Sequence, residues 1–561
     1  MKFSEFEYVR PDIKKMQESF DNLLEKFKNA NTFEEQDEII ANINDIRSDF
    51  ESNSSLVYVR NTINTNDKFY EAEKKFMDEN SPLYEELVTK YYKALMSSKF
   101  EKELREKWGN QIFDLADKQL KTFKKDIIDD LMEENKLKSE YTKLLASAKI
   151  DYKGQIRNLS QMVPFVQSKD RAQRKEAYEV QTKFFEENEE KFDKIYDDLV
   201  KLRTKIAKKL GYKNFVELGY NRLSRTDYDS SMVEGYRNQI INDLVPLATK
   251  LKEMQKERLN LDNLYYYDEP LTFLDGNATP KGDANWILDN GKKMYSLLSS
   301  ETKEFFDFMM ENETMDLLTK EGKAAGGYCT YISKYQTPFI FSNFNGTSGD
   351  IDVLTHEAGH AFQMYQSRHY KLPEYQFPTL EACEIHSMSM EFLTWPHMEL
   401  FFKEDTKKYK FAHLTSSITF IPYGALVDEF QHVVYENPDM TPKERKQAWR
   451  ELEKKYLPHR DYFDNEFLKA GGYWFRQGHI FKNPFYYIDY TLAQVCALQF
   501  FSKANVDFDN AFKDYLQLCK KGGSMPFLQL VKSANLNNPF VEGTIKETLK
   551  VPEKWLLNNI L

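Results

Sequence analysis

The chain has 561 residues, of which 41% are apolar and 30% are charged, and its formal net charge is −11. That length exceeds what one hydrophobic core usually spans and predicts more than one lobe. The negative charge argues against nucleic-acid binding, which requires clustered positive charge. The first residues lack the apolar run of a signal peptide, no segment suits a membrane span, and the four cysteines are scattered. We therefore expect a cytoplasmic protein without membrane contact.

Residues 1 to about 190 are predicted to be helical throughout. Thr32 and Glu35 have the spacing of a capping box. A later apolar stripe runs from Phe192 to Leu210 and ends at Gly211, which suits a left-handed helix C-cap. All nine histidines lie between positions 356 and 479. We therefore predict a helical N-terminal lobe over residues 1–190, acting as wall or lid, and a region over 191–561 that carries the chemistry.

Two short strands are predicted at residues 328–333 and 338–344, directly before the segment with the first histidines. A strand in that place could hold an extended peptide as a further strand of the sheet. The alternative is a small hairpin that only supports the following helix.

The central motif is His356-Glu357-Ala358-Gly359-His360. On a helix, residues i and i+4 lie on the same face, so the two imidazoles can bind one zinc ion while Glu357 faces a water. In a chain this poor in histidine, the pattern would arise by chance roughly once in a hundred sequences. Asp350 is the expected N-cap of this helix. Gly359 lowers helix propensity by about 1 kcal/mol relative to alanine, which suggests that another backbone approaches it closely.

A catalytic zinc site takes three protein ligands, and the third must come from elsewhere. Residues 378–393 are predicted to form a helix on which Glu381, Glu384 and Glu391 share one face. Spacing does not decide between Glu381 and Glu384 as the ligand. His386 falls on a different face, and we expect a structural or substrate-facing role for it.

A second polar cluster follows near the C-terminus. His479 is followed by Tyr486, Tyr487 and Tyr490, whose hydroxyls can donate hydrogen bonds to negative charge that develops on a carbonyl oxygen. Each such donor is worth roughly 3–4 kcal/mol in a transition state. The alternative is an aromatic turn in the core. Residues 428–432 add a further polar group, which either supports the metal ligands or forms a buried polar network, and we interpret it as structural support.

Together these motifs resemble the oligoendopeptidase F branch of the thimet oligopeptidase family of zinc peptidases. The resemblance covers the chain from about residue 200 to its end, and the N-terminal helices match only in character. The matching segments are residues 210–220, 334–344, 356–360, 384–391, 427–432 and 479–490. The thimet branch has a glycine-rich stretch where this chain has Lys482-Asn-Pro-Phe485.

The resemblance implies a mostly α-helical, two-lobed zincin-type peptidase. It implies a small β-sheet next to the helix that carries His356, and a deep substrate channel between the lobes. It also implies one Zn²⁺ per chain, with Glu391 in a supporting role. The implied metal ligands are His356, His360 and Glu384, and the implied catalytic residues are Glu357, His479, Tyr490, Tyr486 and Tyr487.

The function expected from the resemblance is hydrolysis of internal peptide bonds in short unfolded oligopeptides. Glu357 would act as general base, and His479 with Tyr490 would hold the carbonyl oxygen. Three alternatives remain open: a metallocarboxypeptidase, a zinc hydrolase acting on another amide, and a peptide-binding protein without turnover. The sequence gives no oligomeric state.

Overall fold

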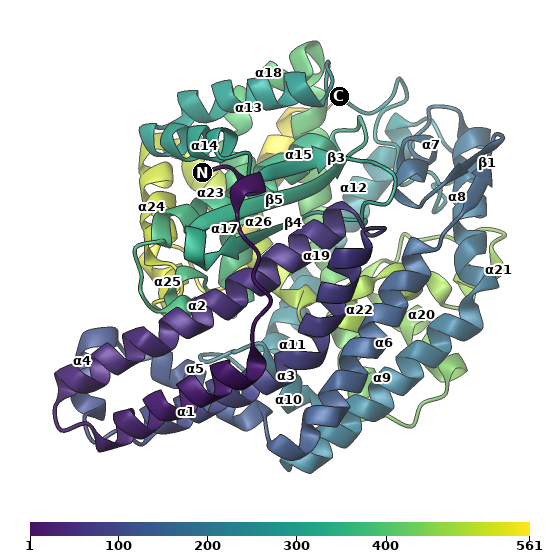
Figure 1. Ribbon diagram of the computed structural model, residues 1–561. Coiled ribbons are helices and arrows are strands. Elements are labelled where there is room, and N and C mark those ends of the chain that lie inside the picture. Colours follow the sequence, from purple (N-terminus) through teal and green to yellow (C-terminus); the bar gives the residue numbers. More distant parts are fainter. Residues whose placement is uncertain (561) are drawn as a thin grey trace.

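Helices make up most of residues 1–560, the part of the chain that the computed structural model describes, and two small sheets complete it (Figure 1). The mostly α-helical fold predicted from the sequence is thus confirmed. Within these residues, no helix combines the length and the apolar character that crossing a membrane requires.

The N-terminal helices share a hydrophobic cluster of their own, which also takes in Leu372 and Tyr375. A second, larger cluster includes residues from Ile127 to Leu556. Along the chain, buried residues up to Ala116 belong to the first cluster and those from Ile127 onward mostly to the second. The division into two regions at residue 190 stays a prediction. The helices of residues 1–149 are α1 (Ile13–Asn29), α2 (Phe33–Ile63), α3 (Lys68–Met96), α4 (Glu101–Trp108), α5 (Gln111–Thr122) and α6 (Ile128–Ala146), of which α6 contributes to the larger cluster.

The next stretch begins with an antiparallel pair, β1 (Ile150–Tyr152) and β2 (Gln155–Arg157). Gly211 ends α9 in the left-handed conformation with φ of 92°, as predicted from the sequence. The helices that follow the pair are α7 (Val163–Val166), α8 (Arg171–Glu187), α9 (Glu189–Leu210), α10 (Phe215–Arg222), α11 (Ser230–Gln239), α12 (Val245–Arg258), α13 (Ala284–Leu298) and α14 (Ser300–Glu311).

A three-stranded sheet in the order β3-β5-β4 precedes the helix of the central motif. β4 (Tyr328–Ile332) and β5 (Thr337–Phe344) are antiparallel and confirm the two predicted strands. β3 (Met315–Leu318) runs parallel to β5 and was not predicted. Its four residues include no β-branched or aromatic side chain, so the usual strand signal is absent.

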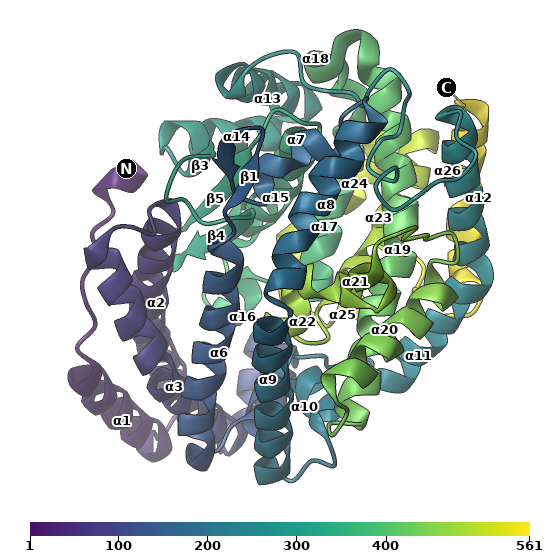
Figure 2. The same ribbon diagram turned by 90° about the vertical axis from the view of Figure 1, so that its right-hand side faces the viewer.

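Three helices stack at the centre of the molecule. α17 (Leu380–Leu393) packs against both α15 (Gly349–Ser367) and α23 (Tyr487–Val506), and α19 (Thr406–Glu436) packs against α23. β4 and β5 contact α15, which places the sheet beside the helix that carries His356 and His360. Figure 2 shows α1, α2 and α3 on one side of this stack and α12 and α26 on the other. The remaining helices are α16 (Pro373–Gln376), α18 (Glu399–Phe402), α20 (Pro442–Tyr456), α21 (Glu466–Lys469), α22 (Gly478–Lys482), α24 (Phe508–Lys521), α25 (Phe527–Ser533) and α26 (Thr544–Asn558).

The start of α15 differs from the sequence prediction. The helix begins at Gly349, so Asp350 lies in its first turn and is not the N-cap. The Asp350 carboxylate instead accepts the backbone N–H groups of Asn345 and Gly346, each at 2.8 Å. Asp350 therefore fixes the loop between β5 and α15, and with it the position at which the helix starts.

Gly359 allows α15 and α17 to cross in close contact. A Cβ atom at this position would lie 2.6 Å from the Cα of Ser387 and 2.7 Å from the carbonyl oxygen of His386. Both of these atoms belong to the backbone of α17, so a flexible side chain could not move aside to relieve the clash. The glycine therefore sets the distance between the two helices.

We expect Gly359→Ala to lower the free energy of unfolding by about 1–3 kcal/mol, the usual cost of overpacking, measured by urea denaturation. Gly235→Ala is the matched control, because Gly235 lies on the exposed face of α11 with nothing within 4 Å of the added Cβ. The control should stabilise the protein slightly through helix propensity. Equal effects of the two substitutions would contradict the proposed role of Gly359.

Candidate metal centre

Two histidines and one glutamate converge where α15 crosses α17. His356 and His360 lie one turn apart on α15, and Glu384 faces them from α17, with the candidate ligand atoms of the three side chains all within 4.8 Å of one another. Glu384 Oε2 lies 3.2 Å from His356 Nε2 and 3.3 Å from His360 Nε2. Glu381, the other glutamate that spacing allowed, is outside this cluster. The helix crossing thus brings Glu384, and not Glu381, to the two histidines.

These distances fit a shared metal ion. Ligand atoms about 2.1 Å from a common centre and arranged tetrahedrally are about 3.4 Å apart. Two imidazole nitrogens and a carboxylate oxygen also form a donor set typical of catalytic zinc. The His356, His360 and Glu384 cluster is therefore a candidate metal site.

His356 contacts a carboxylate that also contacts a further histidine. Glu391 Oε1 lies 2.7 Å from His356 Nδ1, and Glu391 Oε2 lies 2.7 Å from His413 Nε2. A proton on His356 Nδ1 that is donated to Glu391 leaves the Nε2 lone pair free for a metal. His413 lies on α19 and was missed from the sequence, although it was one of only nine histidines.

The other two candidate ligands have different partners. His360 Nδ1 lies 3.2 Å from the Cys383 thiol, a weaker hydrogen-bond partner than a carboxylate. Glu384 accepts the Ser387 hydroxyl at Oε2, 2.8 Å away, and the Tyr486 hydroxyl at Oε1, 2.5 Å away. Burial opposes ionisation of Glu384, but the adjacent His360 and His356 hold its pKa well below the usual range. An ionised Glu384 is the form that can bind a metal.

Glu357 lies beside the three candidate ligands. The residue is buried, with 7% of its surface exposed, and a Cβ added to Gly327 would lie 3.6 Å from its Oε1. Among residues 1–560, Oε2 of Glu357 has no hydrogen-bond partner. Burial raises the pKa of Glu357, and the charges of His356 and His360 oppose that rise. Glu357 is thus a carboxylate with a free oxygen and raised basicity.

His479 and the three candidate tyrosines lie together, although they face different groups. His479 Nε2 is 3.3 Å from the Tyr490 hydroxyl, and Tyr486 reaches Glu384. The ring of Tyr487 packs against His479, with centroids 4.9 Å apart, and also against Phe420. Burial lowers the pKa of His479 to about 4, so the imidazole is neutral at pH 7.

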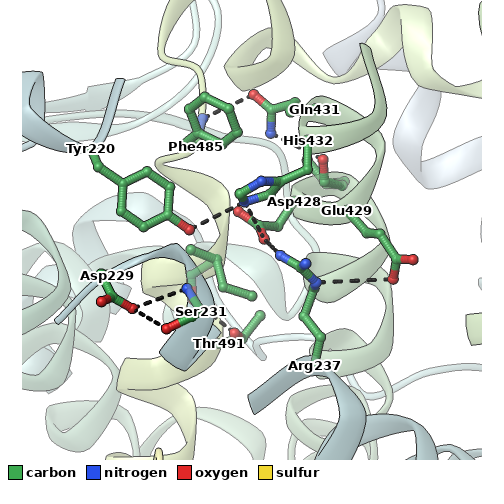
Figure 3. Close-up of polar contacts among 12 residues, drawn as sticks. Tyr220, Asp229, Ser231, Arg237, Asp428, Glu429, Gln431, His432, Phe485 and Thr491 are labelled. Carbon is green, nitrogen blue, oxygen red and sulfur yellow. Dashed lines mark hydrogen bonds and ion pairs between the residues drawn. The ribbon is translucent and has the colours of Figure 1, made fainter. Parts of the chain in front are cut away.

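A strained turn at Phe485 positions these residues. Phe485 has a φ of 66°, a left-handed conformation that is unfavourable for a non-glycine residue. Its N–H donates to Gln431 Oε1 at 2.9 Å (Figure 3), and its carbonyl accepts from Arg225 at 2.6 Å. A Cβ at Gly219 would lie 2.5 Å from the Phe485 ring, so the glycine makes room for that ring. These contacts stabilise the turn that directs Tyr486 toward Glu384.

The polar segment at residues 428–432 contributes to the contacts that stabilise the turn at Phe485. Arg237 forms an ion pair with Asp428, and the Tyr220 hydroxyl lies 3.2 Å from His432 Nε2 (Figure 3). The His432 ring packs against Phe485, with centroids 4.9 Å apart. Within the described chain, the segment reaches the candidate site through Phe485 and supplies no member of the metal cluster.

Comparison with known proteins identifies relatives over nearly the whole chain. The model for the Peptidase M3 N-terminal domain matches residues 3–123, and the model for Peptidase family M3 matches residues 165–272 and 293–548. The chain is similar to Pz peptidase A, solved with an inhibitor, at 58% identity over 100% of both chains and a TM-score of 0.99. A Bacillus anthracis strain Ames protein, provisionally called oligoendopeptidase F, is 54% identical over 100% of this chain and 99% of that one, with a TM-score of 0.94.

A curated relative is more distant. The oligoendopeptidase F homolog of Borreliella burgdorferi is 26% identical over 381 residues, which cover 64% of this chain. The match spans 61% of that protein, less than two thirds of its length.

We expect Glu391→Gln to weaken zinc binding by about 10–100-fold, because it replaces the carboxylate that accepts the proton of His356 Nδ1. Competition with a coloured chelator would measure the affinity. Glu399→Gln, an identical change at an exposed position on α18, is the control. An unchanged affinity in Glu391→Gln would show that Glu391 does not support the site.

Proposed function

Because the chain belongs to peptidase family M3, we propose that it is a zinc-dependent endopeptidase that cuts internal bonds of short, unfolded oligopeptides. The observation that carries this proposal is the convergence of His356, His360 and Glu384 within one cluster, with the free oxygen of Glu357 beside it. The names of the relatives, oligoendopeptidase F and Pz peptidase A, support the same reading.

One Zn²⁺ per chain would be held by His356, His360 and Glu384. When bound, it would supply Lewis acidity, which lowers the pKa of water to about 7 and polarises a carbonyl group. The donor atoms fit this role, since two of their separations are 3.2 and 3.3 Å.

Glu357 would act as general base. Its free Oε2 would take a proton from the attacking water, and the protonated carboxyl would then deliver that proton to the leaving amine. Burial favours this shuttle, because it raises the pKa of Glu357 toward that of the groups with which it exchanges the proton.

His479 and Tyr490 would stabilise the oxyanion that forms when the peptide carbonyl is attacked. A neutral imidazole and a phenol can each donate a hydrogen bond to the developing negative charge. Tyr486 is placed differently, because its hydroxyl is already bound to Glu384. We therefore assign Tyr486 to orientation of the metal ligand. Tyr487 is the least direct of the predicted catalytic residues, because its ring packs behind His479.

The sheet supports an extended peptide as substrate. β4 is an outer strand of the β3-β5-β4 sheet, and Gly327, directly before it, lies beside Glu357. A peptide that pairs with this strand would pass the general base. A channel between two lobes would restrict access to unfolded chains.

We propose the cytoplasm as the location, because all four cysteines are free thiols.

We expect Glu357→Gln to reduce kcat by about 10²–10⁴-fold, the usual contribution of a general base, while zinc content stays at one per chain. Steady-state kinetics and metal analysis of the same preparation would measure both. Glu25→Gln, an exposed site on α1, is the control for charge removal. Full activity in Glu357→Gln with bound zinc would exclude the general-base role.

The proposed function is tested by mass spectrometry of short peptides and one unfolded protein incubated with the enzyme, with and without a zinc chelator. Internal cuts in the short peptides that the chelator abolishes are the expected result. Removal of residues only from C-termini would favour the carboxypeptidase alternative. Peptides that remain intact in zinc-replete buffer would overturn the proposal in favour of a binding protein.

A further inference from the structure

Gln477 forms a bridge behind His479 that the proposed mechanism does not use. This residue lies between the short 3₁₀ helix Gly472–Arg476 and α22. Its amide Nε2 is 2.8 Å from His479 Nδ1, and its amide Oε1 accepts the Tyr423 hydroxyl at 2.9 Å. One side chain therefore joins α19 to the far side of the candidate oxyanion-binding imidazole.

The direction of this bridge determines where the His479 proton lies. The Tyr423 hydroxyl donates to Oε1, so the amide NH₂ of Gln477 faces Nδ1. An NH₂ group can only donate, so Nδ1 must accept with its lone pair. Burial keeps the imidazole neutral by lowering its pKa to about 4. A neutral imidazole carries one proton, which must then be on Nε2.

Nε2 is the nitrogen on the site-facing side of the ring. It lies 3.3 Å from the Tyr490 hydroxyl. In the opposite tautomer, Nε2 would present a lone pair and repel a developing oxyanion. In the opposite tautomer the Tyr490 hydroxyl would also donate to that lone pair. In the tautomer selected by the bridge, Nε2–H faces the Tyr490 oxygen, so the Tyr490 hydroxyl proton stays free for the oxyanion and Nε2–H adds a second donor beside it.

We infer that Gln477, oriented by Tyr423, is a positioning residue that selects the Nε2–H tautomer of His479 for oxyanion binding. This inference rests on the proposed peptidase function. Tyr423 can orient the Gln477 amide because its own ring is packed against other aromatic rings. These are Tyr487, Tyr473 and Trp449, with centroid distances of 5.9, 6.2 and 6.3 Å. Its hydroxyl therefore has a fixed place.

Other groups near His479 do not compete for Nδ1. Lys482 on α22 and Glu384 on α17 influence the ring through their charge. Glu384 has its hydrogen bonds with Ser387 and Tyr486. Tyr490 on α23 faces Nε2, and Tyr487 on the same helix packs on the ring face.

The test is Gln477→Glu in the zinc-loaded enzyme, with kcat and KM measured for one peptide from pH 5.5 to pH 8.5. The carboxylate that this substitution introduces, when ionised, accepts a proton from Nδ1 and thereby reverses the tautomer. At pH 8 we expect kcat to fall by about 10²–10³-fold, as on loss of an oxyanion donor, while KM changes by less than about threefold, since the donor acts mainly in the transition state. Toward pH 5.5 the loss of kcat relative to wild type should become smaller. At that pH the pair formed by the introduced carboxylate and His479 gains one proton. Whether the carboxyl or the imidazole holds the added proton, Nε2 then carries a hydrogen.

Two further variants separate tautomer selection from a general structural role. Gln447→Glu makes the same change at an exposed site on α20 and should match wild type. Tyr423→Phe removes only the hydroxyl that orients the amide, and we expect a loss in kcat smaller than that of Gln477→Glu.

A deficit in Gln477→Glu that does not change with pH, or activity within about twofold of wild type throughout, would overturn the inference. If wild type itself cleaves no peptide, the proposed function fails instead. Should Gln477→Glu not fold, the ring ¹⁵N shifts of His479 in the zinc-loaded wild type, assigned by comparison with His479→Gln, decide the matter. A protonated Nε2 is expected, and a protonated Nδ1 would contradict the inference.

Discussion

The backbone contact between α15 and α17 is the constraint on which the rest of the site depends. At Gly359 the two helices are so close that even a methyl group would meet the backbone of Ser387 and His386. This separation brings Glu384 Oε2 to within 3.3 Å of both histidine Nε2 atoms. A larger residue at this crossing would push Glu384 away from a metal held by the histidines.

The three candidate ligands have hydrogen-bond partners of different strength. His356 has a carboxylate behind it that is shared with His413, whereas His360 has the thiol of Cys383. A carboxylate makes an imidazole a stronger electron donor than a thiol does. We therefore infer that His356 is the more tightly held of the two histidines. Glu384 is fixed at both oxygens by hydroxyl groups.

The turn that precedes Tyr486 has a strained backbone. Phe485 adopts its left-handed conformation because Gln431 and Arg225 bind its N–H and carbonyl groups and Gly219 leaves space for its ring. Such strain persists only where surrounding contacts enforce it. Residues of α10 and α19, and of the turn after α10, thereby fix the turn from which Tyr486 reaches Glu384. This explains why segments without catalytic groups, such as residues 428–432, form part of the sequence pattern.

Local features could be predicted from the amino-acid sequence: the helical fold, the two strands before α15, the C-cap at Gly211 and the position of His356 and His360 on one helix face. Each of these features depends on residues that are close together in the chain. The spacing of apolar residues, or a single glycine, is therefore enough to predict them. Residue spacing left Glu381 and Glu384 open as ligands; the family resemblance favoured Glu384, and the helix crossing places that residue beside the two histidines. The contacts of His413, Cys383 and Gln477 became visible only in the folded protein. Those contacts join residues on different helices, and their distances depend on how the helices cross, which the spacing of residues along a chain does not encode.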